Sequence, residues 1–429
     1  MAFLRMGCYA RGVVVAVTLL PTGGALLAQD TTALTLSESI HIAEARSRQL
    51  VAEDDAAISA REQAAAAALS PDPTLTVGIN NLPINGPDAF SLTRDFMTMR
   101  SIGLSRELTH GDKRDARAAR FELEAQAAEA GRTLALANLQ RDTAVAWVDR
   151  HYRERMEEVL ASQRAQAALQ VEAADLAYRG GRGPQSDVFA ARLAVAVIED
   201  RMAAAQRDTA IATTKLERWI GGAAGRPLSP PPAMCTVSLS EADLNGELAH
   251  HPEIAFMRKQ EEVARADAEV ARTEKRSNWT VELMYSQRGP DFSNMMSLNA
   301  SKPLQWHEKE RQDRELAARL ATADRMRALR EEETRAHVAD AHALLQAWQS
   351  NRARVERYAS SLIPLASERT TAATAAYRGG TGSLGAVLDA RVSEIGVRLN
   401  QLELEMATAE LWAELSFIVP ADHSAASHE

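Results

Sequence analysis

Residues whose side chains could bind a metal are spread through the sequence rather than grouped. The candidates are soft or borderline ligands, namely Met97, Met99, Met295, Met296, His423 and His428. None of them has the ligand spacing of a known metal site, and methionines near strand ends more often serve in packing. His337 and His342 are five residues apart, so they do not share a helix face. We therefore expect no metal site and no cofactor.

Catalytic motifs are also missing from the sequence. It contains no phosphate-binding loop, no nucleophile elbow and no zinc-protease helix motif. No residues therefore support an ATPase or hydrolase activity, and we expect that the protein is not an enzyme. If the protein helps to move a substrate, the energy must come from a partner.

Two aspartates follow two similar turns. The segment AYRGGRGPQSDVFAAR, residues 177–192, contains Asp187, and AYRGGTGSLGAVLDAR, residues 376–391, contains Asp389. In a ring of identical chains each carboxylate would recur, and rings of carboxylates at a constriction select cations and can hold a gate closed. Asp187 has an equally good alternative role, because an acidic residue near a helix N-terminus stabilises the helix dipole.

The two turns belong to an internal repeat. Tyr178 and Tyr377 are 199 residues apart, Trp147 and Trp348 match in the same way, and all offsets lie between 196 and 203. A segment rich in proline and glycine separates the copies, and its composition predicts that it forms no helix. The sequence thus divides into a first repeat (29–220), a linker (221–237), a second repeat (238–420) and a flexible tail (421–429).

Each repeat is predicted to run helix, strand, loop, strand, very long helix, turn, helix. The composition between Pro87 and Pro184 favours a continuous helix from Asp112 to about Ala177. Such a helix would be roughly 100 Å long at 1.5 Å per residue. Alternating residues joined by turn residues predict strand pairs at about 74–108 and about 278–304. The two hairpin turns then lie at about 178–187 and about 377–389.

The last helix of the second repeat carries apolar residues at spacings of four and three. These residues are Leu388, Val392, Ile395, Leu399, Leu402 and Met406. The pattern predicts a coiled-coil seam. In the first repeat Leu193 and Val197 lie among many alanines, which favours close packing mediated by alanine.

The first 28 residues have the three-part pattern of a secretory signal peptide. Arg5 and Arg11 precede an apolar run, and small residues follow it. Removal of this segment takes the net charge from −9 to −11, because it carries two arginines and no acidic residue. This charge argues against nucleic acid as a partner. Cys8 is also removed, which leaves Cys235 as a single thiol and excludes an internal disulfide.

The predicted strands raise the question of where they pair. Alternation over eight to ten residues is typical of outer-membrane hairpins, although soluble hairpins look much the same. Four strands cannot close a barrel, and an open edge in lipid leaves unpaired backbone groups. Several chains must therefore share one barrel if it spans a membrane. Two chains would give 8 strands and a filled interior, whereas three would give 12 strands and a passage. A cyclic trimer is the simpler solution for a duct.

The sequence resembles the TolC-like outer-membrane factors across essentially the whole mature chain. The resemblance rests on the signal peptide, the duplicated plan, the HHPEI segment at 250–254 and the two matched turns. Residues 81–100 look like the first barrel loop of members associated with heavy-metal efflux. The segment Arg106-Glu107 departs from the family's Ser-x-Pro-Leu pattern, which the second repeat keeps at 301–304.

The resemblance implies a mainly α fold with a small β part. Duplicated long α-helical hairpins would form a periplasmic tunnel, and four strands per chain would contribute to a trimeric 12-stranded transmembrane β-barrel in the outer membrane. The implied function is that of a passive exit duct of a tripartite efflux pump, here for heavy-metal cations. The implied partners are two further copies, a periplasmic adaptor (membrane fusion) protein, an inner-membrane proton-driven RND-type pump and outer-membrane lipid.

The resemblance also implies site residues. It places both turns at the periplasmic tip, where the adaptor docks. Members of the family narrow their tunnel with aspartates near this tip, and the resemblance implies this role for Asp187 and Asp389. The predicted docking residues are Arg179, Gly180, Gly181, Gly183, Arg378, Gly379, Gly380 and Gly382.

Two alternative functions remain at this point. The protein could be a periplasmic adaptor or scaffold, although an adaptor usually has one hairpin between β-rich domains, or it could be a duct for drugs or other small molecules.

Overall fold

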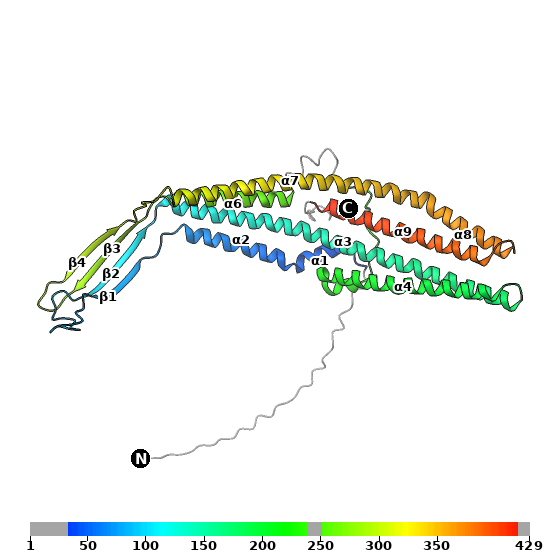
Figure 1. The fold of residues 1–429 in the computed structure, drawn as a ribbon, viewed down its shortest axis with the longest axis horizontal. Helices are drawn as coiled ribbons and strands as arrows, with labels where there is room; N and C mark the ends of the chain where they lie inside the picture. Colours follow the sequence, from blue (N-terminus) through cyan, green and yellow to red (C-terminus); the bar gives the residue numbers. More distant parts are fainter. Residues whose placement is uncertain (1–32, 238–250, 419–429) are drawn as a thin grey trace, which may run out of the picture.

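The computed structural model describes residues 33–237 and 251–418. They form one elongated molecule, with helices along most of its length and a small sheet at one end (Figure 1). The predicted signal peptide and tail lie outside the described residues, as does His250 of the HHPEI segment. The combination of long helices and one small sheet confirms the predicted fold class.

Two helices, rather than the single one predicted, precede the first strand. α1 spans Leu36–Arg46 and α2 spans Arg48–Ala67. They are separated at Ser47, whose backbone is extended and whose Oγ accepts a hydrogen bond from the Leu50 amide at 3.3 Å. Serine favours this N-cap position because its side chain satisfies an amide that has no partner within the helix. The chain therefore starts a new helix at Ser47.

The sheet contains four antiparallel strands among the described residues, in the order β1-β2-β3-β4. The strands are β1 (Thr74–Asn80), β2 (Met99–Leu108), β3 (Trp279–Gln287) and β4 (Met295–Ser301). β2 pairs with β3 from Arg100 opposite Gln287 to Leu108 opposite Trp279. The first hairpin comes from the first repeat and the second hairpin from the second repeat. One continuous sheet therefore joins the two halves of the chain.

The predicted long helix of the first repeat is uninterrupted. α3 spans Gly111–Arg179, a length of 69 residues, and α4 returns along it over Gln185–Ile220. Buried alanines line α3, and their small side chains let neighbouring helices approach closely. In contrast, Leu193 and Val197 of α4 are 66% and 44% exposed, so they do not take part in the packing within one chain.

In the second repeat, α6 (Pro252–Thr273) precedes β3 and takes the place of α1 and α2. The long helix that follows β4 is interrupted. It begins as α7, Gln312–Arg357, and a π-helical turn at Tyr358–Leu362 then leads into α8, Ile363–Arg378. Pro364 explains the change, because proline lacks an amide hydrogen and clashes with the preceding turn. The prediction of one unbroken helix was therefore wrong here. Across residues 33–237 and 251–418, no helix is long and apolar enough to cross a bilayer.

The last helix, α9, spans Leu384–Ser416 and packs along α8 and α3. Ile395 and Leu402 of the predicted seam are buried, but Val392 is 48% exposed. Val387, next to the predicted Leu388, is buried instead. The buried face therefore drifts from the strict heptad, because α9 contacts helices of both hairpins rather than one partner.

The main core lies where α1, α3, α4 and α9 meet. Trp147 is fully buried there, and its Nε1 donates a hydrogen bond to the Leu34 carbonyl at 3.3 Å.

The linker also folds against this core. Gly221–Gly225 form a short 3-10 helix (η1), so the prediction that residues 221–237 contain no helix was wrong. The Arg150 guanidinium donates hydrogen bonds to the carbonyls of Ala224 and Arg226. These bonds hold the glycine-rich segment against the core.

Candidate functional site

The two predicted hairpin tips have the same backbone geometry. α3 ends at Arg179, and Gly181 follows with φ +65°; α8 ends at Arg378, and Gly380 follows with φ +73°. In the first tip the Arg182 amide bonds the Ala177 carbonyl at 2.9 Å. This pattern, with glycine in the left-handed conformation, is the Schellman motif. Both helices therefore end in a left-handed glycine cap.

The second tip repeats these bonds and adds a close approach. The Thr381 and Gly382 amides both donate to the Ala376 carbonyl, at 2.9 and 3.0 Å. A Cβ added at Gly382 would lie 3.0 Å from Cβ of Ala376, whereas one at Gly183 of the first tip would lie 3.4 Å from Cβ of Ala177. The space around Gly382 therefore leaves less room for a side chain than the space around Gly183. Docking of an adaptor at these glycines stays a prediction.

Basic side chains surround both turns. Arg179 is 74% exposed at its side chain and pairs with Asp175 at 2.8 Å. Arg182 and Arg378 are also exposed. Gly180 and Gly379 occupy the helix caps between these arginines and the left-handed glycines. Each tip therefore presents a compact turn flanked by positive charge.

The structure places the two predicted aspartates differently. Asp187 is partly buried in the first turn of α4, where it can stabilise the helix dipole. Asp389 is exposed in the second turn of α9. Neither carboxylate makes a hydrogen bond or ion pair with any described residue. Both remain available for contacts outside the chain, and their role at a constriction stays a prediction.

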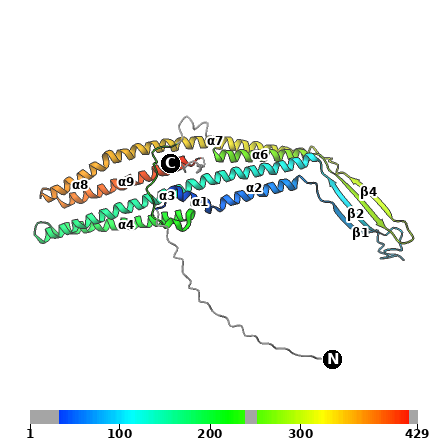
Figure 2. The ribbon, with the colours of Figure 1, turned by 180° about the vertical axis from the view of Figure 1, so that it is seen from behind.

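The two tips lie side by side at one end of the molecule (Figure 2). A small apolar cluster joins them, in which Val188 and Ala191 of α4 pack with Leu384 and Val387 of α9. These residues directly follow the two turns. The helices that carry Asp187 and Asp389 are therefore held together within one chain.

Arg391 forms a polar bridge that is not among the predicted site residues. Its guanidinium, on α9, donates a hydrogen bond to Oε1 of Gln166 on α3 at 2.5 Å, and the Gln170 amide oxygen can accept from it as well. Burial lowers the pKa of Arg391, but an arginine stays charged at neutral pH. The bridge ties the second hairpin to the first just behind Asp389. The matching Arg192 in the repeat was the available signal.

The sheet carries a second candidate surface. Two cross-strand rows of large apolar side chains cover one face, and all eight are between 42% and 73% exposed. The rows are Leu75, Leu104, Leu283 and Leu298, and Val77, Ile102, Tyr285 and Met296. The neighbouring rows on the opposite face are mostly polar, for example Thr74, Ser105, Glu282 and Asn299. The outer edges of β1 and β4 pair with no strand of the described chain.

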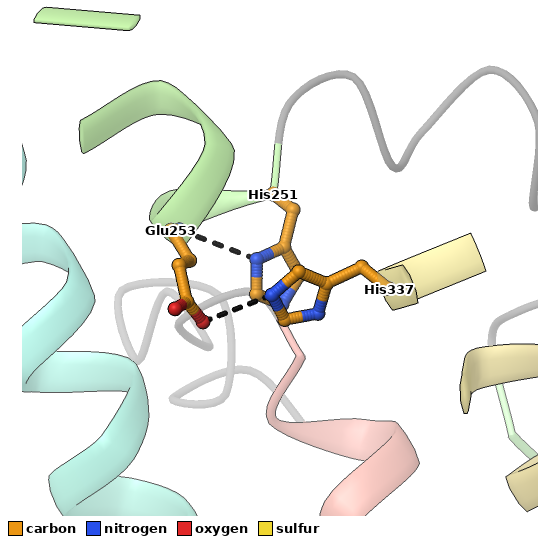
Figure 3. Close-up of side chains that lie close together, drawn as sticks. All are labelled: His251, Glu253 and His337. Carbon is orange, nitrogen blue, oxygen red and sulfur yellow. Dashed lines mark hydrogen bonds and ion pairs between the residues drawn. The ribbon is translucent and has the colours of Figure 1, made fainter. Parts of the chain in front are cut away.

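A third cluster lies between the start of α6 and the middle of α7 (Figure 3). Nδ1 of His251 accepts a hydrogen bond from the Glu253 amide at 3.2 Å and so caps α6. Oε2 of Glu253 lies 3.0 Å from Nε2 of His337. The two imidazole rings are tilted by 32° against each other, with their centroids 4.6 Å apart. The sequence gives no sign that these residues meet, because they belong to different helices and lie far apart in the chain.

Comparison with solved structures shows which fold this geometry represents. CusC, which forms a transmembrane channel, matches with a TM-score of 0.75 and 16% identity, over 89% of this chain and 91% of that chain. The outer-membrane channel OprN matches with 0.74 and 17%, over 89% of each chain. The CmeC outer-membrane channel of Campylobacter jejuni matches with 0.73 and 14%, over 91% of this chain and 88% of that chain.

No protein-family model and no curated protein matches the sequence. At these identities the likeness to the solved channels shows the fold. The chain therefore has the fold of these outer-membrane channels over about nine-tenths of its length. The similar structures are channels rather than enzymes.

Proposed function

We propose that this protein is one subunit of a homotrimeric duct in the outer membrane, the exit channel of a tripartite efflux pump. The sheet carries the proposal. It exposes an apolar face built from two rows of large side chains, and both of its edges lack a strand partner within the described chain. Neither feature suits a single chain in water, because exposed apolar patches and open edges lead to association.

Lipid and two further copies would satisfy both features together. In a closed barrel every edge strand is paired, and the apolar rows would face the acyl chains. Three chains with four strands each give 12 strands, enough to leave a passage. The exposed Leu193 and Val197 on α4 would then lie between chains of the same assembly.

The long helices support the periplasmic part of the proposal. α3 alone would extend roughly 100 Å at 1.5 Å per residue, which suits a tunnel that reaches toward the inner membrane. The two tips at its far end would dock an adaptor protein, and a proton-driven RND-type pump would supply the energy. Asp187 and Asp389 would form carboxylate rings near the entrance. Replacing Arg179 and Arg378 with glutamate should then weaken adaptor binding, whereas Arg155→Glu, far from the tips, should not.

We propose heavy-metal cations as the exported substrates. The support is the resemblance of residues 81–100 to the loop of metal-exporting members, together with the acidic residues behind the tips. Deletion of the gene should lower tolerance of the cells to heavy metals. If deletion instead sensitises the cells to drugs or detergents and leaves metal tolerance unchanged, the protein is a duct for other small molecules.

Cell fractionation tests the duct itself. The full-length protein, expressed with its own signal peptide, should appear in the outer-membrane fraction as a trimer that dissociates on heating in detergent. Recovery in the soluble periplasmic fraction as a monomer would contradict the proposal and favour an adaptor or scaffold.

A further inference from the structure

The histidine cluster offers three metal-binding atoms from two helices. His251 is the N-cap of α6, Glu253 lies in the first turn of α6, and His337 belongs to α7 (Figure 3). One ligand atom from each residue lies within 4.8 Å of the other two. Glu333, one turn before His337, places a second carboxylate oxygen 3.5 Å from the same Nε2. Two imidazoles and a carboxylate are a ligand set typical of zinc.

One imidazole nitrogen of the cluster lacks a hydrogen-bond partner in the part of the chain that the structure describes. Among the described residues, Nε2 of His337 has no hydrogen-bond partner of acceptable geometry, although Oε2 of Glu253 is only 3.0 Å away. The distance fits but the direction does not, because a hydrogen in the plane of the ring would not point at the oxygen.

To bind one metal ion, the three ligand atoms must come slightly closer together. In a tetrahedral site with bonds of about 2.0–2.1 Å, neighbouring ligand atoms lie about 3.3 Å apart. The pair formed by Glu253 and His337, at 3.0 Å, already has nearly this separation. Only the His251 ring has to move closer, and it borders a cavity of about 320 Å³ that Asp340 also lines. Arg141 is the opposing positive charge in this lining, and its guanidinium pairs with Asp142 at 2.9 Å.

We propose that His251, Glu253 and His337 bind one divalent transition-metal ion of the zinc class, with Glu333 or water as the fourth ligand. Nδ1 of His251 now accepts the Glu253 amide hydrogen. A neutral ring that binds a metal through one nitrogen carries its proton on the other, so it can no longer accept that bond. Metal binding would therefore exchange the cap of α6 for a link between α6 and α7. The proposal does not depend on the identity of the exported substrate.

Zinc titration of the purified full mature chain tests this site. The protein, in detergent and with Cys235→Ser to remove the exposed thiol, is stripped with a chelator and titrated with Zn²⁺ against a chromophoric competitor. It should bind one more tight Zn²⁺ per chain than His251→Ala or His337→Ala, or bind it at least about tenfold more tightly. Mg²⁺ should not compete, because it prefers oxygen ligands. Co²⁺ should give the visible absorption of a tetrahedral site, and both variants should lose it.

Two further variants keep the result interpretable. His342→Ala removes another histidine from α7 that is not part of the cluster, and it should bind Zn²⁺ as the parent does. Glu253→Gln keeps the backbone amide and the side-chain size, so it should weaken binding without unfolding α6. Far-UV circular dichroism checks the fold of each variant. Equal Zn²⁺ binding by the parent, His251→Ala and His337→Ala would overturn the proposal, as would a parent that binds no tight Zn²⁺.

Discussion

At the scale of single residues, the glycines of the tips are set by backbone geometry. Gly181 and Gly380 have positive φ, and a Cβ at either would meet nothing within 4 Å. Their requirement is therefore conformational rather than steric. Gly382 differs, since its limit is the nearby Ala376 side chain. Bulky substitutions at these glycines would change the turn itself, so the flanking arginines test adaptor docking more directly.

Replacement of Gly380 by alanine should destabilise the second tip by about 1–2 kcal/mol, the cost of the left-handed conformation for a residue with a Cβ. Hydrogen-exchange mass spectrometry of residues 370–390 should show faster exchange. Gly396→Ala is the matched control, because that glycine lies inside α9 with open space around its Cβ position. It should stabilise the helix by about 0.5–1 kcal/mol. Equal effects of the two substitutions would contradict the assignment.

Glu274 links the end of α6 to the start of α3. Its carboxylate pairs with Nζ of Lys113 at 3.0 Å and with Arg117, and Lys113 is almost fully buried. Burial by itself would raise the pKa of Glu274, but the hydrogen bonds and charges of Lys113 and Arg117 together lower it below its ordinary value. The ionised carboxylate therefore stabilises the folded state at neutral pH.

Glu274→Gln should lower the free energy of unfolding by about 1–3 kcal/mol at pH 7, because Lys113 loses its ionised partner. A carboxyl with a lowered folded-state pKa contributes stability above its unfolded pKa and loses it as the pH falls through the folded pKa. The difference from wild type should thus shrink in acid, as measured by thermal unfolding at several pH values. Glu315→Gln, in an exposed pair with Arg319, should cost only about 0.3–0.5 kcal/mol. A difference independent of pH would argue against this account.

At the scale of elements, α9 is held by side chains from both hairpins. Ile395 packs with Leu160 of α3 and Ile198 of α4, and all three are buried. Val392, one turn earlier, is largely exposed. The predicted coiled-coil seam is therefore only partly the packed face.

Truncation of Ile395 to alanine should destabilise the packing of α9 by about 2–5 kcal/mol, because it removes buried methyl groups and leaves a cavity. Val392→Ala should change stability within about 0.5 kcal/mol if the residue stays exposed. Denaturant unfolding followed by circular dichroism measures both. A larger effect at Val392 than at Ile395 would show that the heptad pattern, rather than the face seen here, describes the packing.

At the scale of the whole molecule, the proposed location in the outer membrane rests on the apolar face of the sheet. Leu298 lies in the middle of β4, opposite Leu283, and its side chain is 73% exposed. Ser297, the preceding residue, points to the other face because side chains alternate along a strand. The two positions are therefore adjacent in one strand but occupy opposite faces of the sheet.

Leu298→Arg should strongly reduce the amount of trimer in the outer membrane, since arginine facing lipid near the bilayer centre costs about 2–4 kcal/mol per chain. Ser297→Arg should leave the amount of trimer nearly unchanged. Outer-membrane fractions analysed with and without heating provide the measurement. Equal loss in both variants would mean that the leucine row does not face lipid.

The sequence by itself determined the local elements and their duplication. The unbroken α3, the strand pairs and the left-handed caps follow from composition, alternation and glycine placement, which act over a few residues. The two helix interruptions that were not predicted also have local causes. Ser47 separates α1 from α2, and Pro364 accompanies the π-helical turn before α8. Asp187 and Asp389 could be placed on their helices from the sequence, but not in any contact.

Only the tertiary structure decided which distant residues meet. It paired β2 with β3, turned Val392 outward, folded η1 against Arg150 and brought His251 beside His337. Such contacts depend on how entire helices pack against one another. A residue's spacing along its own helix fixes the face it occupies but not the partner helix or the register between them.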